Sequence, residues 1–203
     1  MILLSNLLYT LSLQGVLNNL RIKKAFEEVD RVDFVQPSLI DRAYENCPLP
    51  LGWAQTISQP YTVAFMLDLL DVRQGDTVLD IGSGSGWTTA LLANMTGSEG
   101  AVLGLERIST LVEFGASNLA KYSFSHAEIT AAGSALGNPG SLYNKILVSA
   151  TSEELPEELI LQLKIGGILV IPVENSILKI TRITMEEIET EKHYGFVFVP
   201  LII

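Results

Sequence analysis

The chain has 203 residues and a formal net charge of −10, from 13 Lys and Arg against 23 Asp and Glu. This length suits one domain with a sizeable core, and 48% hydrophobic residues argue against disorder. The sequence holds no basic run that could bind phosphates, so nucleic acid is not an expected partner. The single cysteine, Cys47, excludes an internal disulfide framework and favours a reducing compartment, and with only two histidines no metal site is expected.

The first twenty residues are apolar, but their pattern does not fit a signal peptide or a membrane span. No basic n-region and no small-residue cleavage pattern come before Arg21, and polar residues interrupt the apolar run. Leu4, Leu7 and Leu11 share one helical face, which predicts a packed amphipathic helix. We therefore expect a cytoplasmic protein that does not bind a membrane.

The first part of the chain predicts a helical region followed by an irregular one. Helices are expected over residues 2–14 and 18–30, which a turn at Gly15 separates. Residues 44–60 contain three prolines and a glycine, which rule out long elements, and a further helix is expected over 61–70. An irregular, polar stretch in an apolar chain is a typical place for functional residues.

A short strand, a glycine-rich turn and a helix follow one another from residue 78. Val78 to Ile81 predicts a buried strand, glycines stand at 82, 84 and 86, and a helix is expected from Thr88. Glycines let the backbone approach a ligand closely, and a helix start offers unpaired N–H groups to an anion. The dinucleotide fingerprint needs a glycine at position 87, where Trp87 stands. The spacing resembles the nucleoside loop of S-adenosylmethionine-dependent methyltransferases, the alternative being a turn that binds nothing.

Strand and helix patterns alternate after this loop. Strands are expected over 101–106, 145–149 and 168–173, helices over 110–122 and 156–163, and β-rich segments over 177–184 and 195–203. The alternation predicts an α/β fold with a doubly wound, mostly parallel sheet, here with an N-terminal helical cap. In such a fold the ligand binds at the carboxyl ends of the strands, near the point where the strand order reverses.

Glu106 ends the strand after the glycine loop, about 20 residues further on, where an acidic side chain can accept hydrogen bonds from both hydroxyls of a ribose. The alternative is an exposed carboxylate at a strand end. The combination of glycine loop and Glu106 is a stronger signal than either part alone.

Two hydroxyl side chains, Thr56 and Ser58, lie close together in the block from Gln55 to Pro60. They could hold a carboxylate through directional hydrogen bonds. The alternative is a helix start, with Ser58 at or near the N-cap and Pro60 at the first helical position.

The stretch from residue 43 to 64, with Gln-Thr-Ile-Ser-Gln-Pro inside it, resembles the signature of protein-L-isoaspartate O-methyltransferases. Residues 78–93, 102–119, 163–173 and 198–201 resemble that family too. The resemblance implies methyl transfer from S-adenosyl-L-methionine to the α-carboxylate of L-isoaspartyl residues, whose ester then cyclises to a succinimide. It implies one methyltransferase domain over 1–203, with residues 1–60 as cap and substrate loop and 61–203 as the donor-binding core. The expected partners are isoaspartyl-containing proteins and peptides, and the expected state is a monomer. The alternatives are a methyltransferase for another peptide carboxylate and a non-catalytic protein that binds the methyl donor.

Matched position by position, the family assigns Ser58 as the catalytic residue that orients the substrate carboxylate. It assigns these donor-binding residues: Gln55, Thr56, Ile57, Gly82, Ser83, Gly84, Glu106, Arg107, Ser134 and Ala135. The sequence departs from the family at Ser134, where an aspartate is usual, and at Ala54, where a glycine is usual. It also ends at Ile203, without the tail that closes over the cofactor in some members.

Overall fold

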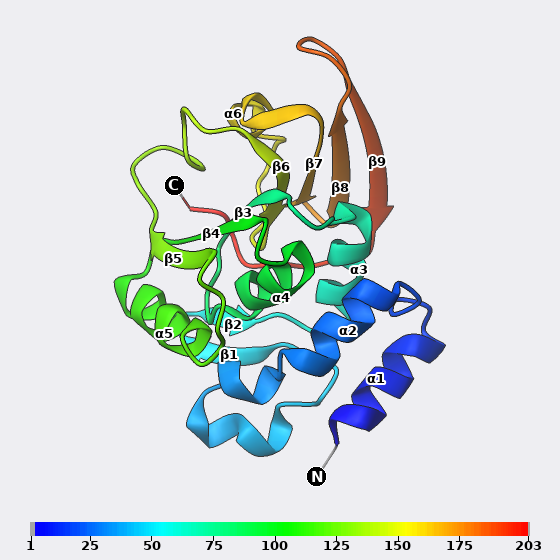
Figure 1. Ribbon diagram of the computed structural model, residues 1–203, viewed down its shortest axis with the longest axis vertical. Coiled ribbons are helices and arrows are strands. Elements are labelled where there is room, and N and C mark those ends of the chain that lie inside the picture. The colour runs from blue at the N-terminus through cyan, green and yellow to red at the C-terminus, as the bar shows by residue number, and fades with distance from the viewer. Residues whose placement is uncertain (1–2, 203) are drawn as a thin grey trace.

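The computed structural model describes residues 3–202 and has a central sheet with helices packed against it (Figure 1). The α-helices are α1 (Leu4–Leu13), α2 (Leu20–Glu28), α3 (Pro60–Leu70), α4 (Trp87–Thr96), α5 (Ser109–Leu119) and α6 (Glu157–Leu161). Two 3₁₀ helices, η1 (Arg31–Phe34) and η2 (Pro37–Arg42), follow α2. The strands are β1 (Leu49–Gly52), β2 (Gln55–Ile57), β3 (Thr77–Ile81), β4 (Ala101–Glu106), β5 (Ala127–Ala131), β6 (Tyr143–Val148), β7 (Leu163–Val173), β8 (Ser176–Arg182) and β9 (Ile188–Tyr194).

The main sheet has seven strands in the order β5-β4-β3-β6-β7-β8-β9. The strands from β5 to β7 pair in parallel, and β8 and β9 pair antiparallel. The order reverses between β3 and β6, so a ligand is expected at the carboxyl ends of these two strands. The predicted α/β fold with a mostly parallel sheet is confirmed, and the predicted N-terminal helices are present.

Successive side chains of the central strands point to opposite faces of the sheet, as the period of two requires. Val78 of β3 belongs to the larger apolar cluster, which it shares with α1 to α5, whereas Leu79 belongs to the cluster on the other face with α6. Because β3 is buried on both faces, its apolar residues Val78, Leu79 and Ile81 do not alternate with exposed polar ones.

Residues 44–60 contain a small antiparallel hairpin, β1–β2, where an irregular stretch was expected. Its strands are short and its turn is formed by Trp53 and Ala54, with φ of 51° and 56°. Such a turn favours Asn and Gly, so these two residues gave no hairpin signal.

The prediction of a β-rich segment over 195–203 is wrong for the described residues 195–202. The last strand is β9, and only Pro200 makes a further bridge, to Thr151. The end of the chain is apolar because Phe196 and Phe198 pack on the core and the residues after them border a cleft. In Figure 1 this segment, in red, runs back from the end of β9 along the sheet.

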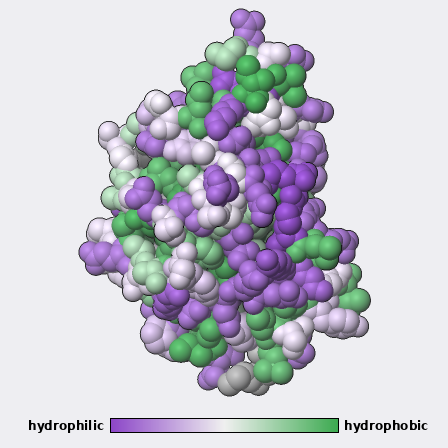
Figure 2. Space-filling view, in the orientation of Figure 1, coloured by the Kyte–Doolittle hydropathy of each residue, from purple (hydrophilic) through white to green (hydrophobic). Residues whose placement is uncertain are grey.

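Two edge strands, β5 and β9, were not expected from the sequence. In β9 nearly every side chain is exposed, and in β5 only Ile129 is fully buried, so neither strand alternates clearly between apolar and polar residues. Figure 2 shows the side of the molecule that carries β9 as largely hydrophilic, with apolar residues at the projecting β8–β9 turn. Charged edge strands of this kind resist pairing with other chains.

No helix within residues 3–202 is long and apolar enough to cross a membrane.

Candidate active site

A cleft lies at the carboxyl ends of β3, β4 and β6 and has two compartments. Their empty volumes, open mouths included, are about 620 and 510 Å³. Gln55, Gly82, Glu106 and Ala150 line both compartments, which therefore adjoin each other. The first compartment is mainly apolar, with Leu105, Ala132, Leu136, Pro200, Leu201 and Ile202 in its wall. The second carries hydroxyl groups, from Thr56, Ser58, Ser83, Ser85, Thr88 and Ser149.

The glycine loop is tied to β4 by main-chain and carboxylate hydrogen bonds. The N–H groups of Gly82 and Ser83 donate to Leu105 O at 2.9 and 3.1 Å. Gly84 N donates to Glu106 Oε2 at 3.1 Å, and Ile108 N donates to Glu106 Oε1 at 2.9 Å. Each carboxylate oxygen can accept a further bond, because an ionised carboxylate has about four acceptor positions. Glu106 is 6% exposed, so it is a buried anchor of the loop and not the exposed strand-end carboxylate considered as the alternative.

Gly86, the third glycine of the motif, serves helix packing. Its φ is +87°, and a Cβ there would lie 2.8 Å from Gly115 O of α5 and 2.9 Å from Ile129 Cδ1. Only a glycine fits at this approach of the loop to α5 without a shift of backbone atoms. Gly82 and Gly84 also have positive φ but border the cleft.

Asp80 lies fully buried beneath the loop. Its Oδ2 accepts hydrogen bonds from Thr88 Oγ1 and Thr89 Oγ1, both at 2.7 Å, while its Oδ1 has no protein partner within residues 3–202. Burial raises the pKa of Asp80 to about 6, although the two threonine hydroxyls lower it; Glu106 adds a smaller upward effect. The carboxyl group therefore titrates near neutral pH.

Ser58 lies directly before the N-cap of helix α3, but its side chain does not cap the helix, so the alternative role as a capping residue is wrong. The N-cap is Gln59, without a side-chain cap bond, and Pro60 takes the first helical position as expected. The N–H of Tyr61 is instead satisfied by Asn46 Oδ1 at 3.0 Å. The hydroxyl of Ser58 makes no hydrogen bond in the described part of the chain, and Ser58 borders the second compartment.

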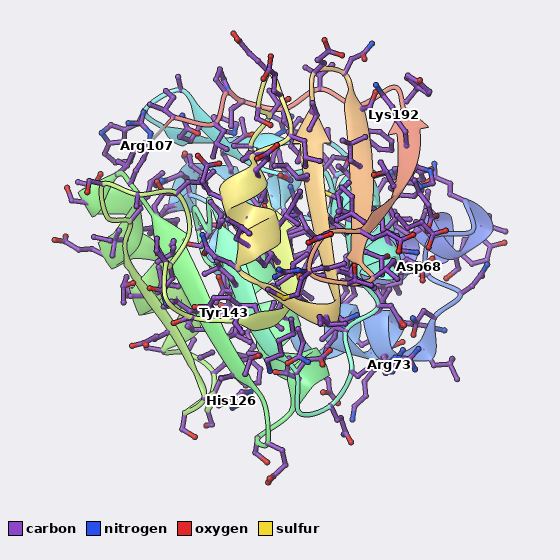
Figure 3. All side chains as sticks on the ribbon, turned by 90° about the horizontal axis from the view of Figure 1, so that it is seen from above. Asp68, Arg73, Arg107, His126, Tyr143 and Lys192 are labelled. Atoms are coloured by element: carbon purple, nitrogen blue, oxygen red, sulfur yellow. The ribbon has the colours of Figure 1, made fainter. Side chains whose placement is uncertain are left out.

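The structure brings nearly all the residues expected at the site to this cleft. Arg107 and Ala135 line the first compartment, and Figure 3 shows Arg107 at the opposite end of the sheet from His126. Thr56, Ile57, Ser58, Ser83 and Gly84 line the second compartment, and Gln55, Gly82 and Glu106 line both. Ser134 is exposed and lies between two lining residues without lining the cleft itself.

Several residues of the cleft were missed by sequence reasoning. Ser149 and Ala150 follow β6, and the rule that ligands bind at the carboxyl ends of strands could have pointed to them. Pro200, Leu201 and Ile202 come to the cleft because Thr151 pairs with the end of the chain: Leu201 N donates to Thr151 O at 2.7 Å. No local pattern signals that contact.

The sheet order and this cleft are those of the S-adenosylmethionine-dependent methyltransferases. A Plasmodium falciparum structure described as a PCMT with S-adenosyl-L-homocysteine superposes with a TM-score of 0.87 at 27% identity, covering 97% of this chain and 96% of that one. The model of the family "Protein-L-isoaspartate(D-aspartate) O-methyltransferase (PCMT)" matches residues 4–203, and the chain belongs to this family.

Curated relatives agree over almost the full length. A protein-L-isoaspartate O-methyltransferase of Flavobacterium psychrophilum is 41% identical over 203 residues, covering 98% of this chain and 94% of the relative. One of Ignicoccus hospitalis is 38% identical over 202 residues, covering 97% of this chain and 95% of the relative.

Proposed function

We propose that this protein transfers a methyl group from S-adenosyl-L-methionine to the α-carboxylate of L-isoaspartyl residues in proteins and peptides. The observation that carries the proposal is the position of Ser58. Its hydroxyl group is free of any capping role and borders the same compartment as the glycine loop. Membership of the protein-L-isoaspartate O-methyltransferase family supports the substrate class.

The chemistry of the cleft fits the methyl donor. Glu106 has acceptor positions left for two ribose hydroxyls, and the apolar first compartment suits a flat base, with Leu105 and Leu136 in its wall. We assign Gln55, Thr56, Ile57, Gly82, Ser83, Gly84, Arg107 and Ala135 to the same donor site, and Ser134 to its rim.

The reaction needs little from the protein beyond placement. When bound, the donor supplies a methyl group that its positively charged sulfur activates. The hydroxyl of Ser58 donates a hydrogen bond to one oxygen of the substrate carboxylate, which leaves the other oxygen free to attack. A carbon–oxygen bond forms as the carbon–sulfur bond breaks, and no proton has to move. Orientation of two bound groups can therefore supply most of the rate.

In this assignment residues 1–60 form the helical cap and the substrate side, including Ser58, and contribute Gln55, Thr56 and Ile57 to the donor site. Residues 61–203 form the core that supplies the other donor-binding residues. We keep the monomeric state and the cytoplasmic location as expectations; for the location, the single cysteine favours a reducing compartment.

A methyl-transfer assay with paired peptides tests the proposal. The purified protein is incubated with labelled S-adenosyl-L-methionine and an isoaspartyl peptide or its aspartyl twin. We expect label on the isoaspartyl peptide alone. Equal labelling of both would indicate another carboxylate specificity. Label on neither, with S-adenosyl-L-homocysteine still bound in calorimetry, would indicate a donor-binding protein without turnover.

A further inference from the structure

We propose that Arg31, in η1, is the positioning residue of the substrate subsite, because its guanidinium group gathers the segment that carries Ser58. This inference rests on the proposed function. Arg31 is 1% exposed. Its Nη1 donates to Ala43 O at 2.6 Å and to Glu45 O at 3.2 Å. Its Nη2 donates to Cys47 O and to Ser58 O, both at 3.1 Å.

These hydrogen bonds tie both ends of residues 43–58 to a single side chain. The hairpin β1–β2 lies within that segment, and Ser58 follows its second strand directly. With its carbonyl oxygen held by Arg31, the backbone of Ser58 has a fixed place beside the second compartment. The direction of the Ser58 hydroxyl therefore depends on Arg31, although Arg31 is not among the residues that line the cleft.

The guanidinium group also brings a positive charge that no carboxylate of the described residues contacts directly; the charge of Glu45 acts on it only from a longer distance. All four of its hydrogen-bond partners are neutral carbonyl oxygens, and no ion pair of Arg31 occurs within residues 3–202. The nearby carboxylate of Glu45 pairs with Arg42 at 2.8 Å instead. Burial lowers the pKa of Arg31 to about 10, so the group stays charged at neutral pH.

This charge lies next to the second compartment. The Cζ atom of Arg31 is 5.3 Å from the ring centroid of Trp87, and Trp87 lines that compartment. A buried cation that no carboxylate contacts directly creates a positive potential that favours a nearby anion. The isoaspartyl carboxylate bound at Ser58 is the anion that this arrangement fits.

Lysine cannot replace this arrangement, because its single ammonium group has no planar fork to reach separate carbonyls. The test compares Arg31→Lys with Arg182→Lys. Arg182 is 3% exposed and likewise donates to main-chain carbonyls, those of Ile160, Leu161 and Leu163. Arg182 is the last residue of β8 and lies beside the amino end of β7. It lines neither compartment of the cleft, so it controls for the loss of a buried arginine as such.

For Arg31→Lys we expect kcat/KM for the isoaspartyl peptide to fall at least about tenfold, mainly through a higher KM. The Kd for S-adenosyl-L-homocysteine should rise by clearly less than the KM, because Glu106 and the glycine loop keep their places. Of the donor residues, only Gln55, Thr56 and Ile57 lie in the segment that Arg31 holds. Arg182→Lys should lower Tm and leave both constants unchanged. Unchanged peptide kinetics in Arg31→Lys, or equal losses of peptide and S-adenosyl-L-homocysteine binding, would overturn the inference. A wild-type protein inactive on the isoaspartyl peptide would overturn the proposed function itself, and this inference with it.

A measurement on the wild-type protein covers the case in which Arg31→Lys does not fold. The Nε–H of Arg31 is buried and has no partner in the described residues, so its NMR resonance reports the surroundings of the guanidinium group. With S-adenosyl-L-homocysteine already bound, saturating isoaspartyl peptide should shift this resonance, and the aspartyl twin should not. An unchanged resonance at saturation would contradict the inference.

Discussion

At the scale of single residues, the side chain that contacts the start of helix α3 is that of Asn46 and not that of Ser58. The sequence allowed Ser58 either to cap this helix or to bind the substrate carboxylate. Asn46 caps helix α3 through Tyr61 N, and the hydroxyl of Ser58 is left for a ligand. Asn46 also accepts a hydrogen bond at its carbonyl from Gln59 Nε2, at 3.0 Å. The segment before α3 is thus held by residues distant in sequence.

Substitution of these two residues should separate stability from turnover. Ser58→Ala should slow turnover about ten- to a hundredfold, because one hydrogen bond to a charged group is worth roughly 1.5–3 kcal/mol. Asn46→Ala should lower the free energy of unfolding by about 1 kcal/mol, the usual cost of a lost cap. Thermal unfolding and the peptide assay on both variants provide the check. A Ser58→Ala protein with normal turnover and a lower Tm would reverse the assignment.

The buried carboxyl group of Asp80 predicts a pH dependence of stability. Its pKa is raised from 3.8 to about 6 in the folded protein, so the folded state binds more protons than the unfolded state between these values. Its contribution to stability is therefore fully present below about pH 4 and is lost as the pH rises through 6. Asn at this position cannot titrate. Relative to wild type, Asp80→Asn should gain stability between pH 4 and 7, by an amount on the order of 3 kcal/mol at most.

Urea unfolding of both proteins at pH 4, 5, 6 and 7 measures this difference directly. Other groups, such as Glu45 and Glu191, whose pKa values are lowered by Arg42 and Lys179, contribute equally to both proteins. Parallel stability curves for the two proteins would show that Asp80 does not titrate in this range.

At the scale of elements, the hairpin β1–β2 carries strain in its turn. Trp53 and Ala54 both have left-handed backbone angles, which cost a residue with a Cβ about 1–2 kcal/mol. The hairpin also begins the segment that leads to Ser58. Turn strain of this kind is tolerated where the surrounding contacts hold the backbone, here the four hydrogen bonds of Arg31.

Relief of this strain should stabilise the protein. Ala54→Gly is expected to raise the free energy of unfolding by about 1 kcal/mol, after the larger backbone entropy of glycine in the unfolded chain is allowed for. Ala120→Gly is the matched control: Ala120 is also exposed, but its φ of −64° is ordinary, so the same change should destabilise. Equal effects of the two substitutions on Tm would contradict the strained turn.

The elements that could be predicted from the sequence are those whose local pattern reflects their surroundings. β3 was predictable because burial on both faces requires the apolar side chains of Val78, Leu79 and Ile81. The loop after it was predictable because close approaches of its backbone require the glycines. β9 was not, because an exposed edge strand has no apolar face to display. Residues 195–202 were wrongly expected to be β-rich. Their apolar side chains, such as those of Phe196 and Phe198, pack on the core although the backbone forms no strand of the sheet.

At the scale of the whole molecule, the cleft is assembled from three parts of the chain that are distant in sequence. The glycine loop and Glu106 come from the centre of the sheet, Ser58 from the segment before α3, and Pro200 from the last residues. The glycine loop and Glu106 were predictable from their motif and from the rule for parallel sheets, and Ser58 from the block that contains it, whereas Pro200 was not. The contacts of Arg31 and Asn46 were not, since tertiary packing alone brings their partners close.

The proposed function requires that one cleft hold both the donor and the isoaspartyl carboxylate. A crystal structure with S-adenosyl-L-homocysteine and an isoaspartyl peptide shows whether it does. We predict the ribose hydroxyls on Glu106, the base in the first compartment, and the peptide carboxylate within about 2.5–3.0 Å of Ser58 Oγ. A carboxylate bound away from Ser58, or a nucleoside outside this cleft, would contradict the account.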